Sequence, residues 1–270
     1  MKEKFGVTSI ILRRLEVFWL EEWIDHYLSI GFEKIVLYDN GTLSIDDGIY
    51  SQGARQLTSE EINCGKWKKK PDAEYFEEFS DGYISNKLKE IKLKYEGILE
   101  VIPWECKKNH DYDYPLSQRQ AFRHCFENYP EYWWACFDPD EFLVMLKDKD
   151  IQSLRHRYSK ANCLQFKQRI FEERKKGVSA KKNINWGYDC EDRHECKVMC
   201  RGPVDTESKW ALYPHSIKPQ KCILRVFDKD IARINHYRGN PAKSGKDGYS
   251  EVYINNGKPL FNKIDNSINE

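Results

Sequence analysis

The sequence lacks an excess of charge of either sign, because 44 Lys and Arg residues are balanced by 43 Asp and Glu residues and the net charge is +1. Nucleic-acid-binding proteins usually show a clear basic excess, so the composition does not support that class of function. The sequence also lacks an apolar run of about 18 residues, which a membrane-spanning helix would need. We therefore expect no nucleic-acid partner and no transmembrane segment.

We expect no charged-plus-apolar leader before the fold, since a strand-like segment already starts at Phe5. The nine cysteines are an odd number scattered from Cys64 to Cys222, which fits a reduced protein better than a disulfide framework. We expect a cytoplasmic protein, or the excised catalytic domain of a longer one.

One cluster of metal-ligand side chains leaves two interpretations open. It consists of Cys190, His194, Cys196 and Cys200. These residues could bind a structural zinc ion, although their spacing is not a familiar finger pattern. The alternative is that the cysteines are free buried thiols that act as small apolar residues.

The first 40 residues predict a strand, a helix and a second strand. Phe5–Leu12 is apolar and β-branched, Leu20–Ile30 has apolar residues at helical spacing, and Lys34–Tyr38 is a short apolar run. This order is typical of a βαβ unit and hence of a parallel sheet. Ligands bind beyond the carboxyl ends of such strands, so the loops that start at Arg13 and Asp39 are candidate binding segments.

Later segments extend the same pattern. We expect strands at 97–103, 132–137, 163–166 and 221–227, helices at 117–128 and 151–158, and loops after Arg233. Without repeats or a low-complexity linker, residues 1–270 are interpreted as one α/β domain with a mostly parallel central sheet flanked by helices. Trp133 and Trp134, in the strand at 132–137, are expected to belong to the core.

The chemical signal is the segment Asp138-Pro139-Asp140-Glu141, directly after that apolar strand. Two carboxylates separated by one residue can converge on Mg²⁺ or Mn²⁺, and such an ion can bridge the oxygens of a diphosphate. Acidic residues that follow a buried strand are costly unless their charge is used or solvated. The alternative is a strand-to-helix turn whose carboxylate caps the helix.

Two longer segments resemble glycosyltransferase family 92 and its family 2-like relatives, which have a GT-A fold. The first is LEEWIDHYL at 20–28, with Gly31 and then IVLYDNG at 35–41, and the second is Ser117–Leu143, which ends in DPDEFL. A shorter match is Ile234-Asn235-His236-Tyr237 followed by Lys243-Ser244. The family's Asn-Glu pair is replaced here by Leu15-Glu16.

The resemblance implies roles for individual residues. It assigns Mn²⁺ or Mg²⁺ binding to Asp138, Asp140 and His236, and contacts with the donor nucleotide or its phosphates to Arg13, Glu16, Asp39, Gln118 and Arg123. Apart from the resemblance, Lys243 or Lys246 in the Gly- and Lys-rich tail could reach the donor phosphates, or the tail could be a frayed basic end.

The resemblance also implies a reaction. We expect sugar transfer from a nucleotide-sugar donor, with UDP-galactose as the first candidate, to a glycan acceptor, with inversion. The donor half would be about 1–145 and the acceptor half about 146–270. Inversion requires a general base, for which Glu172 and Glu173 are favoured over Asp189 and Asp192. All four could instead be solvated charges in a polar loop.

Two other functions use the same observations. A metal-dependent phosphohydrolase or nucleotidyltransferase could also employ Asp138 and Asp140, but it would be expected to need further acidic ligands at fixed spacing. A non-catalytic glycan-binding module would not need the two aspartates.

Overall fold

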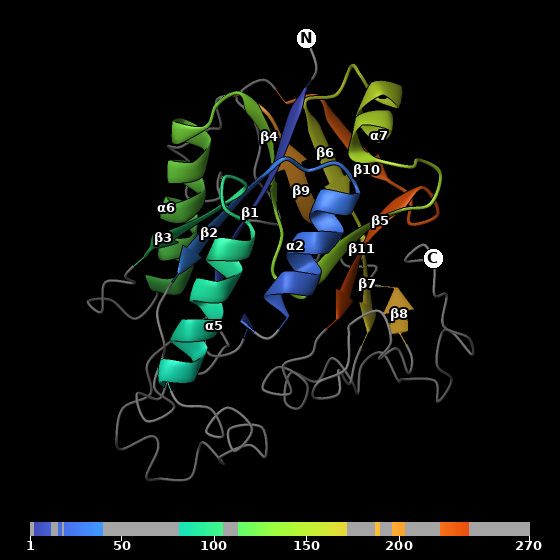
Figure 1. Ribbon diagram of the computed structural model, residues 1–270. Helices are drawn as coiled ribbons and strands as arrows, with labels where there is room; N and C mark the ends of the chain where they lie inside the picture. The colour runs from blue at the N-terminus through green and yellow to red at the C-terminus, as the bar shows by residue number, and fades with distance from the viewer. Residues whose placement is uncertain are drawn as a thin grey trace, which may run out of the picture.

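The computed structural model describes residues 3–11, 16–17, 19–39, 81–104, 113–171, 187–189, 196–202 and 222–237. These residues form a large and a small β-sheet with helices packed against them (Figure 1). The helices are α2 (Leu20–Ser29), α5 (Asp81–Lys94), α6 (Asp113–Asn128) and α7 (Ile151–Arg157). No helix among these residues is long and apolar enough to cross a membrane.

The large sheet has seven strands in the order β10-β6-β9-β4-β1-β2-β3. They are β1 (Lys4–Ile11), β2 (Lys34–Asp39), β3 (Leu99–Pro103), β4 (Tyr132–Cys136), β6 (Cys163–Phe166), β9 (Lys197–Cys200) and β10 (Leu224–Phe227). Only β9 runs antiparallel to its neighbours, β4 and β6. The predicted α/β class with a mostly parallel central sheet is confirmed, as is the first βαβ unit, in which β1 and β2 pair in parallel.

Alternation along the strands gives this sheet two buried faces. One face includes Val7, Leu37 and Trp133 and is covered by α2, α5 and α7. The opposite face includes Ile10, Tyr38 and Trp134 and is covered by α6. Both tryptophans are at most 1% exposed, so the prediction that they belong to the core is confirmed.

The strand order reverses at β1, which lies between β2 and β4. The chain moves outward from β1 through β2 to β3 and then returns through α6 to β4. In open parallel sheets, ligands bind at the carboxyl ends of the strands beside such a switch point. Asp138 follows β4 at this position.

The small sheet was not predicted from the sequence. It has the order β5-β11-β7-β8, with β5 (Glu141–Met145), β7 (Gln168–Phe171), β8 (Gly187–Asp189) and β11 (Ala232–Tyr237). The expectation of loops after Arg233 is wrong for residues 234–237, because β11 pairs with β5 and with β7, and the rest of that segment lies outside the described residues. Apolar and polar residues alternate at the start of the β11 sequence Ala-Arg-Ile-Asn-His-Tyr, which is typical of a strand. Its pairing partners lie far away along the chain, so the sequence around β11 does not reveal the pairing.

Candidate functional site

The segment Asp138-Pro139-Asp140-Glu141, called the acidic turn below, joins the two sheets. It leads from β4 of the large sheet directly into β5 of the small one. The Asp138 N–H donates to Glu141 Oε2 at 2.9 Å, and the Glu141 N–H donates to the Asp138 carbonyl at 2.9 Å. This reciprocal pair fixes the turn. The alternative of a helix N-cap is wrong, because a strand follows.

A buried lysine neutralises part of the acidic turn. Lys197, on β9, places Nζ 2.8 Å from Asp138 Oδ2 and 3.1 Å from Glu141 Oε2, and its side chain is 1% exposed. Burial lowers the pKa of Lys197, but Asp138 and Glu141 raise it by more, so the net shift is upward. The ammonium therefore remains charged at neutral pH. Burial raises the pKa of Glu141, while Lys197 lowers it.

His236 brings an imidazole to the same turn from β11. Its Nε2 lies 3.4 Å from Asp140 Oδ2, and its Nδ1 lies 3.0 Å from Gln168 Oε1. The Gln168 amide nitrogen donates to Glu141 Oε1 at 3.1 Å. The side chains of Glu141, Gln168 and His236 therefore form one chain of contacts behind Asp140.

Asp140 and His236 fit a hard divalent cation. No group of three or more His, Cys, Asp or Glu side chains in the described part of the chain is arranged to hold a metal ion. Mg²⁺ and Mn²⁺ do not require such a cage, because they are often held by one or two protein ligands together with water and substrate phosphates. The Nε2 atom of His236 is buried and has no hydrogen-bond partner among the described residues. Buried polar atoms usually have a partner, so this nitrogen is available to bind a ligand. The Asp138 carboxylate contacts Lys197, and its role as a metal ligand stays a prediction.

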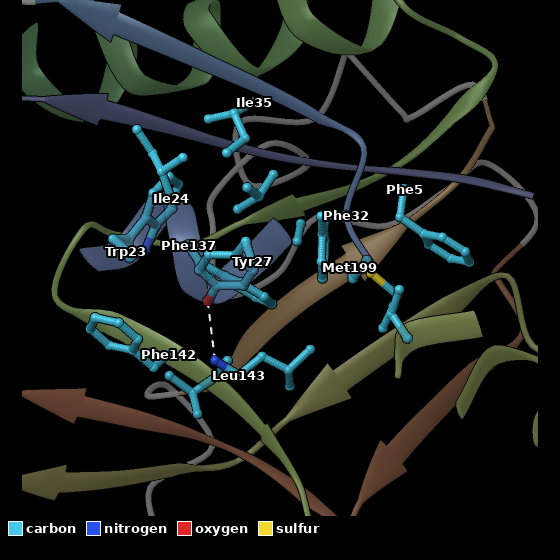
Figure 2. Packing of buried hydrophobic residues seen from close by; sticks show 14 of the residues in the cluster. Phe5, Trp23, Ile24, Tyr27, Phe32, Ile35, Phe137, Phe142, Leu143 and Met199 are labelled. Atoms are coloured by element: carbon cyan, nitrogen blue, oxygen red, sulfur yellow. Dashed lines mark hydrogen bonds between the residues drawn. The ribbon is translucent and has the colours of Figure 1, made fainter. Parts of the chain in front are cut away.

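Helix α2 holds the strand that follows the acidic turn. Trp23 Nε1 and the Tyr27 hydroxyl donate to the Glu141 carbonyl at 3.0 and 2.9 Å, and the Leu143 N–H donates to the Tyr27 hydroxyl at 3.1 Å (Figure 2). His26 Nε2 lies 2.9 Å from the Leu143 carbonyl. Burial raises the pKa of Tyr27, so its hydroxyl keeps the proton that it donates.

This contact explains the spacing within LEEWIDHYL. Trp23, His26 and Tyr27 are related by three and four positions and share one helical face. They satisfy the backbone groups on the side of β5 that does not pair with β11. The segment that carries the resemblance to family 92 thus places side chains against the backbone of the acidic turn and β5.

Two predicted nucleotide contacts lie near the same edge of the large sheet. Asp39 ends β2, is 6% exposed, and accepts the Trp104 N–H on its carbonyl at 2.8 Å. Since β2 and β4 flank β1 in parallel, Asp39 and Asp138 follow the strands at one edge. Glu16 lies between β1 and α2, and its carbonyl accepts the Trp19 N–H at 3.0 Å.

The two residues predicted on α6 have different environments. Gln118 is 7% exposed, whereas Arg123 is exposed. A separation of five residues places them about 140° apart around the helix axis. Their contacts with the donor stay predictions.

Other predicted site residues lie outside the described residues. They are Arg13, Glu172, Glu173 and Lys243. Of the proposed zinc ligands, Cys190 and His194 also lie outside them, whereas Cys196 and Cys200 are buried thiols.

Lys197 and Gln168 belong to the site although the sequence alone does not predict them. Lys197 stands in a polar, cysteine-rich segment, and only its partners 56 and 59 positions away explain its burial. Gln168 follows the strand β6 after one residue and has no distinctive neighbour in the sequence. No local signal identifies either residue.

One comparison with known proteins matches most of the chain. The sequence model of glycosyltransferase family 92 matches residues 75–269. No curated protein matches the chain. Two solved structures from Acinetobacter baumannii show a distant likeness. A UDP-glucose pyrophosphorylase has 14% identity and a TM-score of 0.29 over 62% of this chain and 56% of that one. A UTP-bound UGPase has 10% identity and a TM-score of 0.33 over 87% and 86%.

The chain thus spans little more than half of the first of these structures, and likenesses of this size carry no argument about function. The match to the family model does carry an argument, because it covers most of the chain and includes the acidic turn, Lys197 and His236. The chain belongs to glycosyltransferase family 92.

Proposed function

We propose that this chain is a metal-dependent hexosyltransferase that moves a sugar from a nucleotide-sugar donor to a hydroxyl group of a glycan acceptor, as in polysaccharide biosynthesis. UDP-galactose is the first candidate donor. The observation that carries the proposal is the Asp140–His236 pair. Asp140 lies on the acidic turn beside the switch point of the large sheet, and His236 reaches it from β11 of the small sheet. Membership of family 92 supports the transferase class.

The proposed site uses Asp140 and His236 Nε2 as ligands for Mn²⁺ or Mg²⁺. When bound, the cation would stabilise the negative charge that develops on the leaving nucleoside diphosphate. Asp138 and Lys197 supply one fixed negative and one fixed positive charge beside this position. Asp39, at the same edge of the sheet, is the candidate for contact with the nucleoside.

The transfer itself is proposed as a single displacement. The acceptor oxygen attacks the anomeric carbon, the bond from that carbon to the diphosphate oxygen breaks, and a carboxylate base takes the acceptor's proton. One displacement inverts the configuration of the anomeric carbon. Glu172 and Glu173 remain the candidate bases, since they follow β7 directly in the sequence and β7 pairs with the strand that carries His236.

The experiment is a thermal-unfolding panel with UDP-, GDP-, CMP- and dTDP-linked sugars, each with and without Mn²⁺. A donor at about 100 times its dissociation constant adds roughly 2.7 kcal/mol of stability. For a domain of this size that corresponds to a rise of about 5–10 °C in Tm. We expect the rise with UDP-galactose and Mn²⁺ together, and its loss in Asp140→Ala.

The matched control is Asp230→Ala, which removes an exposed carboxylate outside the site. This variant should keep the donor-induced rise. Equal rises with and without Mn²⁺ would contradict metal dependence. The absence of a rise with every donor, in a protein that unfolds cooperatively, would contradict the assignment of a nucleotide-sugar site.

A further inference from the structure

The contacts of Glu141 and Gln168 determine which nitrogen of His236 carries a proton. Glu141 is 0% exposed, and its carboxylate receives the Asp138 N–H, the Lys197 ammonium and the Gln168 amide. All three partners are donors, so the carboxylate acts only as an acceptor. Its Oε1 atom therefore fixes the orientation of the Gln168 amide, with the NH₂ group toward Glu141.

The opposite end of that amide faces the imidazole. With the nitrogen of Gln168 directed to Glu141, its oxygen lies 3.0 Å from His236 Nδ1. An amide oxygen can only accept a hydrogen bond, so Nδ1 must carry the proton. A neutral imidazole has one N–H, which leaves a lone pair on Nε2.

That lone pair is directed toward a carboxylate. His236 Nε2 lies 3.4 Å from Asp140 Oδ2 and has no hydrogen-bond partner among the described residues. Two electron-rich atoms at this distance become a favourable pair only with a proton or a metal cation between them. Partners that fix the tautomer of a liganding histidine in this way also raise its basicity.

We propose that Glu141 and Gln168 are positioning residues that hold His236 with its proton on Nδ1 and its Nε2 lone pair toward Asp140, preset for a divalent cation. The inference deepens the proposed function and rests on it for the identity of the bound ion. The tautomer itself can be measured on the free protein without donor or metal.

The first experiment is ¹⁵N NMR of the histidine side chains in the wild type at about pH 8.5, well above the ordinary His pKa of about 6.5. The His236 signals are assigned from their loss in His236→Gln. We expect a protonated Nδ1 and an unprotonated Nε2. His26 is an internal control of the opposite kind, because its Nε2 must donate to the Leu143 carbonyl at 2.9 Å. A protonated Nε2 on His236 would overturn the proposal.

The second experiment uses Gln168→Met, which removes the amide and keeps the length of the side chain. We expect His236 to lose the Nδ1–H form and the affinity for Mn²⁺, measured by calorimetry on the free protein, to fall about 10- to 100-fold. Gln165→Met, on the preceding strand β6, is the matched control and should keep both properties. Circular dichroism shows whether each variant is folded.

The outcomes separate this inference from the proposed function. An unchanged tautomer and an unchanged Mn²⁺ affinity in Gln168→Met would overturn the positioning role. A wild type that shows the expected tautomer but binds neither Mn²⁺ nor any donor would contradict the proposed metal site. The role of Glu141 and Gln168 in fixing the tautomer would still be supported.

Discussion

The Lys197 ammonium lies between two carboxylates that precede and begin β5, and it is almost fully removed from water. A buried charge pair adds little net stability when both members are present, because desolvation opposes their attraction. Removal of one member is costly, since the other charge is left without compensation. Loss of Lys197 would cost most at Glu141, because the Glu141 carboxylate is completely buried whereas the Asp138 carboxylate reaches solvent.

We predict that Lys197→Met lowers the free energy of unfolding by about 3–5 kcal/mol. The double variant Lys197→Met/Glu141→Gln should recover much of this loss, because the uncompensated carboxylate is gone and the two effects are not additive for residues in contact. Urea unfolding at pH 7 measures both values. A loss below about 1 kcal/mol in the single variant would contradict the burial of the pair.

At the scale of the secondary-structure elements, side chains of α2 bind the backbone groups on the outer edge of β5, where a neighbouring strand would otherwise bind them. The Tyr27 hydroxyl connects two backbone groups of β5, the Glu141 carbonyl and the Leu143 N–H. Trp23 also reaches the Glu141 carbonyl, so that group keeps a partner if the hydroxyl is lost. The Leu143 N–H would lose the hydroxyl partner that fixes it.

We predict that Tyr27→Phe costs about 1–3 kcal/mol, the penalty for a buried donor that loses its acceptor. Amide hydrogen exchange should accelerate most at Leu143. Tyr132→Phe, at the half-buried start of β4, is the control and should change stability by less than about 0.5 kcal/mol. Equal effects of the two substitutions would contradict the role of the Tyr27 hydroxyl.

Helix α7 offers a prediction about pH. Its N-cap residue Asp150 accepts the Ser153 N–H at 2.7 Å and the Ser153 hydroxyl. The hydrogen bond from the Ser153 side chain is the main cause of a lowered Asp150 pKa. A carboxyl whose folded pKa lies below its unfolded value of about 3.9 stabilises the protein above that value, and the contribution is lost as pH falls through the folded pKa.

Asp150→Ala should therefore lower the free energy of unfolding by about 0.5–2 kcal/mol at pH 7. The difference from the wild type should shrink when the pH is lowered below about 4. Chemical denaturation across this range measures it, with the exposed Asp230→Ala as control. A difference that grows toward acid pH would show that the carboxylate is not stabilised in the folded state.

The elements differ in how far the sequence predicts them. β1, α2, β2 and β6 have strong apolar periodicity, and their bounds agree with the prediction within one residue. β5 was not predicted because it follows the acidic turn without a break, and β9 was not predicted because it stands in a polar, cysteine-rich segment. Their stability comes from pairing with strands distant in the sequence, which no local pattern reports.

The residues of the site also divide into those that a local sequence pattern indicates and those that only long-range contacts explain. The acidic turn was recognised because carboxylates directly after a buried strand need a physical reason. His236 was found through a resemblance and not through its own neighbours in the sequence. Lys197 and Gln168 acquire their roles only when β9 and β7 are brought to the turn by the fold, so their identification required the structure.

At the scale of the whole molecule, the chain passes from the large sheet to the small sheet three times. It does so from β4 to β5, from β6 to β7 and from β10 to β11 (Figure 1). One hydrophobic cluster includes Val7 and Leu37 of the large sheet together with Leu143 and Ile234 of the small one. The sheets therefore share a core, and the candidate site takes Asp138 and His236 from opposite sides of their junction.

A shared core predicts that the two sheets unfold together. Leu143→Ala removes a fully buried side chain of the small sheet and should cost about 2–5 kcal/mol. If unfolding is one cooperative transition, the slowest-exchanging amides of β1 and β2 should lose as much protection as those of β5 and β11. Native-state hydrogen exchange measures both sets in one experiment. Loss of protection confined to β5 and β11 would mean that the small sheet opens by itself, and Asp140 and His236 would then separate from the large sheet before global unfolding.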